Sequence, residues 1–175
     1  MSSSRHGLIH VYTGNGKGKT TAALGLALRA AGHKMNVCVI MFLKGKYLYG
    51  ERCSAREVSG LEIVAYGQRH LIRGTPTKKD FIEAGEAFEH AKSAIKSKRY
   101  DLVILDELTH VVNLGLVKLD DVMKLLREKP NNLELVITGR DSPAEILKVA
   151  DYVSEIVEVK HPYRKGIKSR KGIEY

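Results

Sequence analysis

The chain has 175 residues, of which 43% are hydrophobic and 28% are charged, a composition typical of a soluble globular domain that buries a core of its own. Its apolar runs fall well short of the ~18 residues that cross a bilayer, and Met-Ser-Ser-Ser-Arg-His at the start is unlike a secretory signal peptide. The 29 Lys and Arg residues outnumber the 20 Asp and Glu residues, which favours anionic partners such as a nucleotide, a nucleic acid or a phosphorylated small molecule.

The first part of the chain predicts strands and one helix. The Ala- and Leu-rich segment Lys19–Ala31 predicts a helix that Gly32 caps. Two polar segments, Lys44–Ser59 and Tyr66–Pro76, fit no element, and we expect them to border a ligand site if the strands before them are parallel to the first. The strands themselves are predicted from short apolar runs at Leu8–Tyr12, Val37–Leu43 and Leu61–Ala65.

The second part continues the alternation. A helix is predicted between Thr77 and Lys98, where one apolar stripe comprises Phe81, Ala84, Phe88, Ala91 and Ile95. A second stripe, which ends before Pro130, comprises Leu119, Val122, Met123 and Leu126. Ser142-Pro143-Ala144-Glu145 predicts another helix start, with Ser142 as the cap and Glu145 at the capping-box position. The remaining strands are predicted at Leu102–Leu105, Leu133–Thr138 and Tyr152–Val159.

This order of elements, β-α-β-β-α-β-α-β-α-β, favours one α/β domain over residues 1–175. Most of the strands are too apolar for a sheet with one solvated face, so we expect three layers around a mostly parallel sheet of about six strands. The last sixteen residues, 160–175, hold six Lys or Arg and one Glu. Hydrophobic residues interrupt this basic tail, and we expect it to dock on the domain.

The strongest local signal is a glycine-rich loop between the first strand and the first helix, Thr13-Gly14-Asn15-Gly16-Lys17-Gly18-Lys19-Thr20-Thr21. Glycines let a loop wrap around phosphate oxygens, and the helix that follows directs its N-terminal amides at the same anion. Lys19 adds a positive charge, and the Thr20 hydroxyl can bind Mg²⁺. Thr13 stands where the pattern G-x-x-x-x-G-K-[ST] has glycine, so the loop can differ in shape from that of a standard NTPase.

Two carboxylates follow the apolar run Leu102–Leu105. Asp106 is expected to hold Mg²⁺ directly or through water, as the acidic residue after such a strand does in P-loop NTPases. Glu107 can contact the metal, orient a water molecule or cap a turn. The loop and the two acids together predict a P-loop NTPase-like fold that binds Mg–ATP or a similar nucleotide.

The chain resembles the P-loop family of ATP:corrinoid adenosyltransferases. The matching runs follow in order along nearly the whole chain: V-Y-T-G-N-G-K-G-K-T-T-A-A at 11–23, L-R-A-A-G-H-K at 28–34, F-L-K-G at 42–45, G-E-R at 50–52, L-D-E-L-T at 105–109, V-I-T-G-R at 136–140, A-D-Y-V-S-E at 150–155, K-G-I at 165–167 and G-I-E-Y at 172–175.

The resemblance implies an activity. The family transfers the 5′-deoxyadenosyl group of ATP to Co(I) of a reduced corrinoid and releases triphosphate, in adenosylcobalamin synthesis or salvage. Because Co(I) is itself the nucleophile, the protein has to position C5′ and stabilise the departing triphosphate. In this family the nucleotide is understood to lie reversed in the loop, so that C5′ is exposed.

The resemblance also implies residue roles and partners. Gly14, Asn15, Gly16, Lys17 and Gly18 would wrap the triphosphate, Lys19 would neutralise it, and Thr20 would bind Mg²⁺ with Asp106 or Glu107. Thr21 is a further hydroxyl within reach of a phosphate. Arg140 would lie at the rim of the site, unless it is an ordinary exposed arginine. The implied partners are the reduced corrinoid (cobalamin, cobinamide or a cobyrinate derivative), an electron donor that forms Co(I), and a second copy of the chain.

Two other functions stay open at the level of the residues. A P-loop phosphotransferase or NTPase would act on the γ-phosphate, with Glu107 orienting water. A basic, ATP-dependent nucleic-acid module would use the tail and a stacking patch of Lys44, Lys46, Tyr47, Tyr49 and Arg52, but no RNA-binding motif accompanies it. The two cysteines, Cys38 and Cys53, are too few for a disulfide framework or a zinc site, and we expect reduced thiols in a cytoplasmic protein.

Overall fold

The computed structural model describes residues 6–45, 49–68, 72 and 74–174. Within these residues a six-stranded sheet has the order β3-β2-β4-β5-β1-β6, and every pair of neighbouring strands is parallel. The strands are β1 (Ile9–Thr13), β2 (Val37–Met41), β3 (Leu61–Ala65), β4 (Leu102–Asp106), β5 (Glu134–Thr138) and β6 (Tyr152–Glu155). The predicted six strands and the parallel sheet are therefore confirmed, while the structure adds helices after β2 and after β4 that the sequence did not predict.

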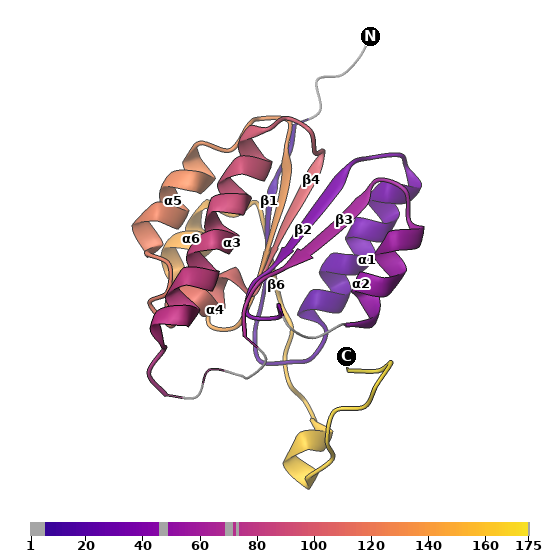
Figure 1. The fold of residues 1–175 in the computed structure, drawn as a ribbon, viewed down its shortest axis with the longest axis vertical. Helices are drawn as coiled ribbons and strands as arrows, with labels where there is room; N and C mark the ends of the chain where they lie inside the picture. Colours follow the sequence, from indigo (N-terminus) through magenta and orange to yellow (C-terminus); the bar gives the residue numbers. More distant parts are fainter. Residues whose placement is uncertain (1–5, 46–48, 69–71, 73, 175) are drawn as a thin grey trace.

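Helices cover both faces of the sheet, which gives the three layers that the sequence predicts (Figure 1). One face carries α3 (Lys78–Lys96), α4 (Leu108–Asn113), α5 (Leu119–Arg127) and α6 (Ala144–Val149), and the other carries α1 (Lys19–Gly32) and α2 (Gly50–Ser54). Two short 3₁₀ helices, η1 (Ala55–Glu57) and η2 (Pro162–Lys165), lie after α2 and after β6. Among the described residues no helix is long and apolar enough to cross a membrane.

The core explains why the central strands are so apolar. All five residues of β2 and of β4 are buried. Toward α3 the sheet packs through side chains such as Val103 and Leu105. Toward α1 it packs through Val39 and Ile104 against alanines of the helix, because small side chains let a helix approach a sheet closely. Removing these apolar surfaces from water on both faces is the main force that stabilises the domain.

The two edge strands depart from this pattern. The residues of β3 are only partly buried, apart from one exposed position. All four residues of β6 are exposed, and the strand ends at Glu155 and not at Val159. An edge strand has a neighbour on one side only, so the apolar run that predicted a longer, covered strand was misleading there.

Several predicted boundaries were wrong for local reasons. Gly32 is the last residue of α1 and His33 its cap, while the left-handed residue that follows is Lys34. Pro143 and not Ser142 occupies the N-cap of α6, which has no side-chain capping bond. Phe81 of the predicted buried stripe is 47% exposed. The segment Lys44–Ser59, expected to lack regular structure, contains α2 and η1.

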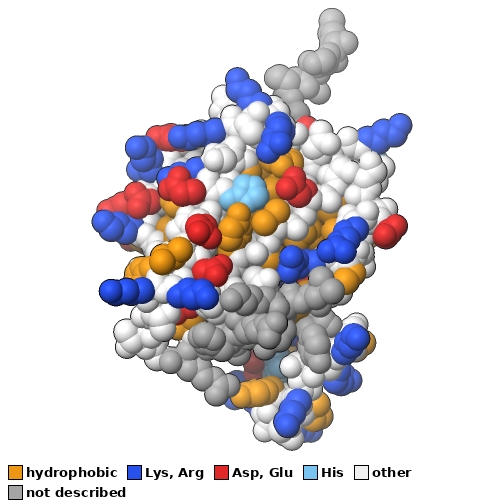
Figure 2. Space-filling view, in the orientation of Figure 1, with side chains coloured by type: hydrophobic (Ala, Val, Ile, Leu, Met, Phe, Trp, Pro, Cys, Tyr) orange, Lys and Arg blue, Asp and Glu red, His pale blue; other side chains and the backbone are white. Residues whose placement is uncertain are grey.

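The tail projects below the carboxyl end of the sheet, beside the start of α1 (Figure 1). Lys and Arg side chains gather on this projecting part of the molecule, whereas acidic and basic side chains are mixed over the helical face above it (Figure 2). In a parallel sheet, ligands bind outside the carboxyl ends of the strands. The loops after β1, β2, β4 and β5 and the tail all meet at that end.

Candidate functional site

The glycine-rich loop, which follows β1, packs against the end of the neighbouring strand β6. Gly14 has φ +92°, and a Cβ there would lie 2.6 Å from the Ile156 carbonyl oxygen. Gly16 is equally close to the same carbonyl, and its N–H donates to it over 2.7 Å. The loop needs glycine at both positions because its backbone passes so near residue 156.

Lys19 reaches back into this loop. Its Nζ donates to the carbonyl oxygens of Gly14, at 2.7 Å, and Gly16, at 2.8 Å. The residue is 7% exposed. Burial lowers the pKa of Lys19 below its ordinary value, although the carboxylates of Glu107 and Asp106 act in the opposite direction. A cation held at the centre of the loop is ready to neutralise a bound anion.

Asp106 lies at the centre of a buried polar cluster. The Thr20 hydroxyl donates to its Oδ1 over 2.9 Å, and the Thr138 hydroxyl donates to the same oxygen over 2.6 Å. Its Oδ2 accepts from Lys44 Nζ at 2.6 Å. This contact between loop and acid forms even though β5 lies between β1 and β4 in the sheet, because α1 starts over the ends of these strands.

Glu107 behaves differently from its neighbour. Its backbone is left-handed, with φ +65°, and its N–H donates to the Thr138 hydroxyl over 3.0 Å. It is the N-cap of α4, and it lines the cavity described next. The adjacent carboxylates therefore have distinct environments: Asp106 is fully buried in the cluster, whereas Glu107 is open to a ligand.

A cavity of about 610 Å³ opens in front of this cluster. Of the predicted site residues, it is lined by Gly16, Lys17, Gly18, Lys19, Thr20, Thr21, Glu107 and Arg140. Gly14 and Asn15 are not part of the lining, and Asp106 lies behind it. The other lining residues are Leu24, Lys44, Tyr49, Gly50, Glu51, Ser54, His161, Gly172, Ile173 and Glu174.

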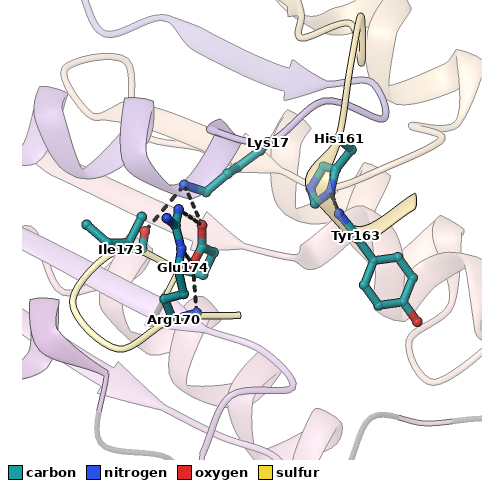
Figure 3. Close-up of polar contacts among 6 residues, drawn as sticks. All are labelled: Lys17, His161, Tyr163, Arg170, Ile173 and Glu174. Atoms are coloured by element: carbon teal, nitrogen blue, oxygen red, sulfur yellow. Dashed lines mark hydrogen bonds and ion pairs between the residues drawn. The ribbon is translucent and has the colours of Figure 1, made fainter. Parts of the chain in front are cut away.

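The C-terminal tail contributes the acidic side chain of Glu174 to the lining of this cavity, next to Lys17 (Figure 3). Lys17 Nζ donates to the Ile173 carbonyl over 3.3 Å and lies 3.7 Å from the Glu174 carboxylate. Arg170 also pairs with Glu174, at 3.0 Å. The hydrogen bonds from Arg170 lower the pKa of Glu174 to about 2, so this carboxylate is charged at physiological pH.

The segment after β2 borders the site, as the sequence predicts, because Lys44, Tyr49 and Gly50 line the cavity. The alternative of an exposed patch for single strands does not fit Lys44, whose side chain is only 17% exposed and pairs with Asp106. Lys46 and Tyr47 of that patch lie outside the described residues. The contact between Lys44 and Asp106 follows from the sheet, since the end of β2 lies beside the end of β4.

The donor set at Thr20 and Asp106 suits a magnesium ion. Among the described residues no three His, Cys, Asp or Glu side chains gather to form a metal cage. One hydroxyl and one carboxylate are, however, the protein ligands of a P-loop magnesium, with phosphate and water oxygens completing the coordination. The Lys44 ammonium contacts the Thr20 hydroxyl oxygen and one oxygen of the Asp106 carboxylate.

The comparison with known families matches residues 5–175 to the family described as "ATP:corrinoid adenosyltransferase BtuR/CobO/CobP". The Corrinoid adenosyltransferase of Escherichia coli K12 is 39% identical over 175 residues, covering 100% of this chain and 89% of that protein. Corrinoid adenosyltransferase CobA of Salmonella typhimurium is 38% identical with the same coverage. The Corrinoid adenosyltransferase of Pseudomonas aeruginosa is 34% identical, covering 97% of this chain and 84% of that protein.

Solved structures of more distant proteins share the fold. KaiC-like protein PH0186 of Pyrococcus horikoshii superposes with a TM-score of 0.59 at 13% identity, covering 89% of this chain and 75% of that one. Flagellar accessory protein FlaH of Methanocaldococcus jannaschii gives 0.56 at 14% identity, covering 86% and 71%. At such identities the likeness concerns the P-loop α/β architecture alone.

Proposed function

The chain belongs to the ATP:corrinoid adenosyltransferase family, and from that membership we propose how its own residues carry out the transfer. It is a transferase that uses ATP and a corrinoid. The carrying observation is that Lys19, Thr20, Glu107 and Arg140 line one cavity at the carboxyl end of the sheet. These are the groups that a polyphosphate leaving group needs.

During the reaction the protein has to stabilise negative charge on the leaving group. The electron pair of Co(I) forms a bond to C5′ of ATP, the C5′–O5′ bond breaks, and its electron pair leaves with triphosphate. Negative charge therefore grows on the leaving group. The Lys19 ammonium, which two loop carbonyls hold in place, is proposed to stabilise that charge. Loop amides are proposed to assist it, apart from the Gly16 amide, which donates to the Ile156 carbonyl.

Mg²⁺ is proposed to be held by the Thr20 hydroxyl and the Asp106 carboxylate. When bound, it would neutralise part of the triphosphate charge and align its oxygens. Glu107, which is open to the cavity, is the second acid within reach. Arg140 and Thr21 also line the cavity. Arg140 is proposed to contact the triphosphate, and Thr21 to donate a hydroxyl hydrogen bond to it.

The tail is proposed to dock over this site, as residues 172–174 line the cavity and residue 173 accepts from Lys17. We propose further that the protein is cytoplasmic, works as a homodimer and receives its corrinoid after an electron donor has reduced the cobalt. The free thiols of Cys38 and Cys53 suit a reducing compartment, and the exposed edge strand β6 offers a surface for a second copy.

An ATP analogue with a β,γ-methylene bridge separates this chemistry from transfer of the γ-phosphate. The methylene group blocks cleavage between the β- and γ-phosphorus atoms but leaves the C5′–O5′ bond unchanged. We expect the analogue to support adenosylation of chemically reduced cobalamin, measured by the absorbance of the cobalt–carbon product under anaerobic conditions. A protein that works only with ATP and releases ADP would instead be the phosphotransferase.

A further inference from the structure

The side chain of Lys44 contacts both residues that are proposed above to hold Mg²⁺. Its Nζ is 3.0 Å from Thr20 Oγ1 and 2.6 Å from Asp106 Oδ2. Mg²⁺ binds its ligands at about 2.0–2.1 Å, so it would need the same oxygens at close range. An ammonium group and a divalent ion cannot share so small a space, and their charges repel each other.

Lys44 and Asp106 form a buried ion pair. The Lys44 side chain is 17% exposed, and its ammonium lies 2.6 Å from the Asp106 carboxylate. The Asp106 side chain is 1% exposed. A carboxylate buried so completely needs a nearby cation whenever no metal is bound.

The backbone at Lys44 is fixed tightly. Leu43, just before it, has φ +60°, a conformation that is strained for a leucine and that concentrates at functional sites. On the other side, a Cβ at Gly45 would lie 2.5 Å from the Gly67 carbonyl oxygen. Lys44 N–H donates to the Tyr66 carbonyl over 2.7 Å. The turn therefore holds the Lys44 backbone in place, and only its flexible side chain can change position.

The Lys44 side chain borders an open cavity that it can enter. Lys44 lines the same cavity as Lys17, Lys19 and Arg140. The ring of Tyr49, which also lines the cavity, has its centroid 5.9 Å from Lys44 Nζ. Because Lys44 lines this cavity and has a flexible side chain, its ammonium can turn from the carboxylate toward the proposed polyphosphate site.

We propose that Lys44 is an internal counter-ion that occupies the magnesium site of the nucleotide-free protein and moves into the triphosphate pocket when Mg–ATP arrives. This inference rests on the magnesium role proposed above. It implies that the free protein binds divalent ions weakly and takes up the metal together with the nucleotide. It also adds a cation to the triphosphate only after the metal is in place.

Titration of the full-length protein with Mn²⁺, followed by the paramagnetic resonance signal of the free ion, tests the proposal. Without nucleotide, Lys44→Met is expected to bind Mn²⁺ about tenfold or more tightly than the unmodified protein, because the positive charge that repels the ion is gone. Lys44→Arg keeps the charge and is expected to bind as weakly as the unmodified protein. Lys17→Met removes a charge from the same cavity without touching Asp106, and serves as the matched control.

The double variant Lys44→Met with Asp106→Asn is expected to bind Mn²⁺ as weakly as the unmodified protein, since the ion that Lys44→Met binds should be held by Asp106. Equal Mn²⁺ affinity of Lys44→Met and the unmodified protein would overturn the proposal, as would a gain that survives the loss of Asp106. If Lys44→Met does not fold, as judged by circular dichroism, Lys44→Gln gives the same comparison.

A second titration in the presence of ATP keeps the two proposals apart. If Asp106→Asn alone leaves Mn²⁺ binding to the protein–ATP complex unchanged, the magnesium assignment fails. If Asp106→Asn weakens it while Lys44→Met has no effect on the free protein, only the role of Lys44 fails.

Discussion

Replacing Lys19 by alanine is expected to lower kcat for adenosyl transfer by about 10²–10³-fold or more, the usual cost of removing one preorganised group that stabilises transition-state charge. The ammonium is held between two loop carbonyls, inside the loop that we propose binds the leaving triphosphate. Because that charge is larger in the transition state than in bound ATP, kcat should fall more than the affinity for ATP. Anaerobic turnover with reduced cobalamin, together with nucleotide binding by calorimetry, measures both.

Lys17→Ala is the matched control for this experiment. Lys17 is in the same loop, but its side chain is 49% exposed and pairs with the tail. Screening by water weakens such a contact, so a much smaller loss of kcat is expected. Near-normal turnover of Lys19→Ala, or equal losses in the two variants, would contradict the role of Lys19.

Replacing Asp106 by asparagine is the second change with a large expected effect. The amide keeps the shape of the side chain but removes the charge that we propose binds Mg²⁺, so we expect a loss of activity that added Mg²⁺ restores only in part. It also leaves the Lys44 ammonium without its carboxylate. Since a charge-assisted hydrogen bond contributes about 1.5–3 kcal/mol, the free energy of unfolding should fall as well.

Magnesium titrations of turnover and thermal unfolding monitor these two effects separately. Glu107→Gln is the neighbouring control, because Glu107 lies on the cavity side of the cluster and outside its hydrogen bonds to Thr20 and Lys44. It should leave stability nearly unchanged. An Asp106→Asn protein with the magnesium dependence of the unmodified protein would rule out Asp106 as a ligand.

The positions of the glycine-rich loop and of Asp106 in the fold could be predicted because each depends on a local pattern. Three glycines, a lysine and a threonine between a strand and a helix are the pattern of a phosphate-binding loop and are uncommon in other loops. Asp106 follows an apolar run whose burial requires a sheet with two covered faces. Their contact through Thr20 then follows from the fold, although the strands concerned are not neighbours.

The role of Lys44 could not be predicted in the same way. Its position after the second strand predicts that it borders the site, but its contact with Asp106 depends on the pairing of β2 with β4. Such long-range register is not encoded in the periodicity along the chain. Ser142 failed for a different, local reason, since Pro143 takes the cap one residue later.

The most direct measurement of the central claim is the fate of the phosphates during turnover. ATP and chemically reduced cobalamin are incubated with the protein without oxygen, and the phosphorus products are counted against the light-sensitive cobalt–carbon product. Intact triphosphate in equal amount to that product is the expected result, since all three phosphates leave together in the proposed reaction. ADP and orthophosphate, formed without a cobalt–carbon bond, would contradict the account.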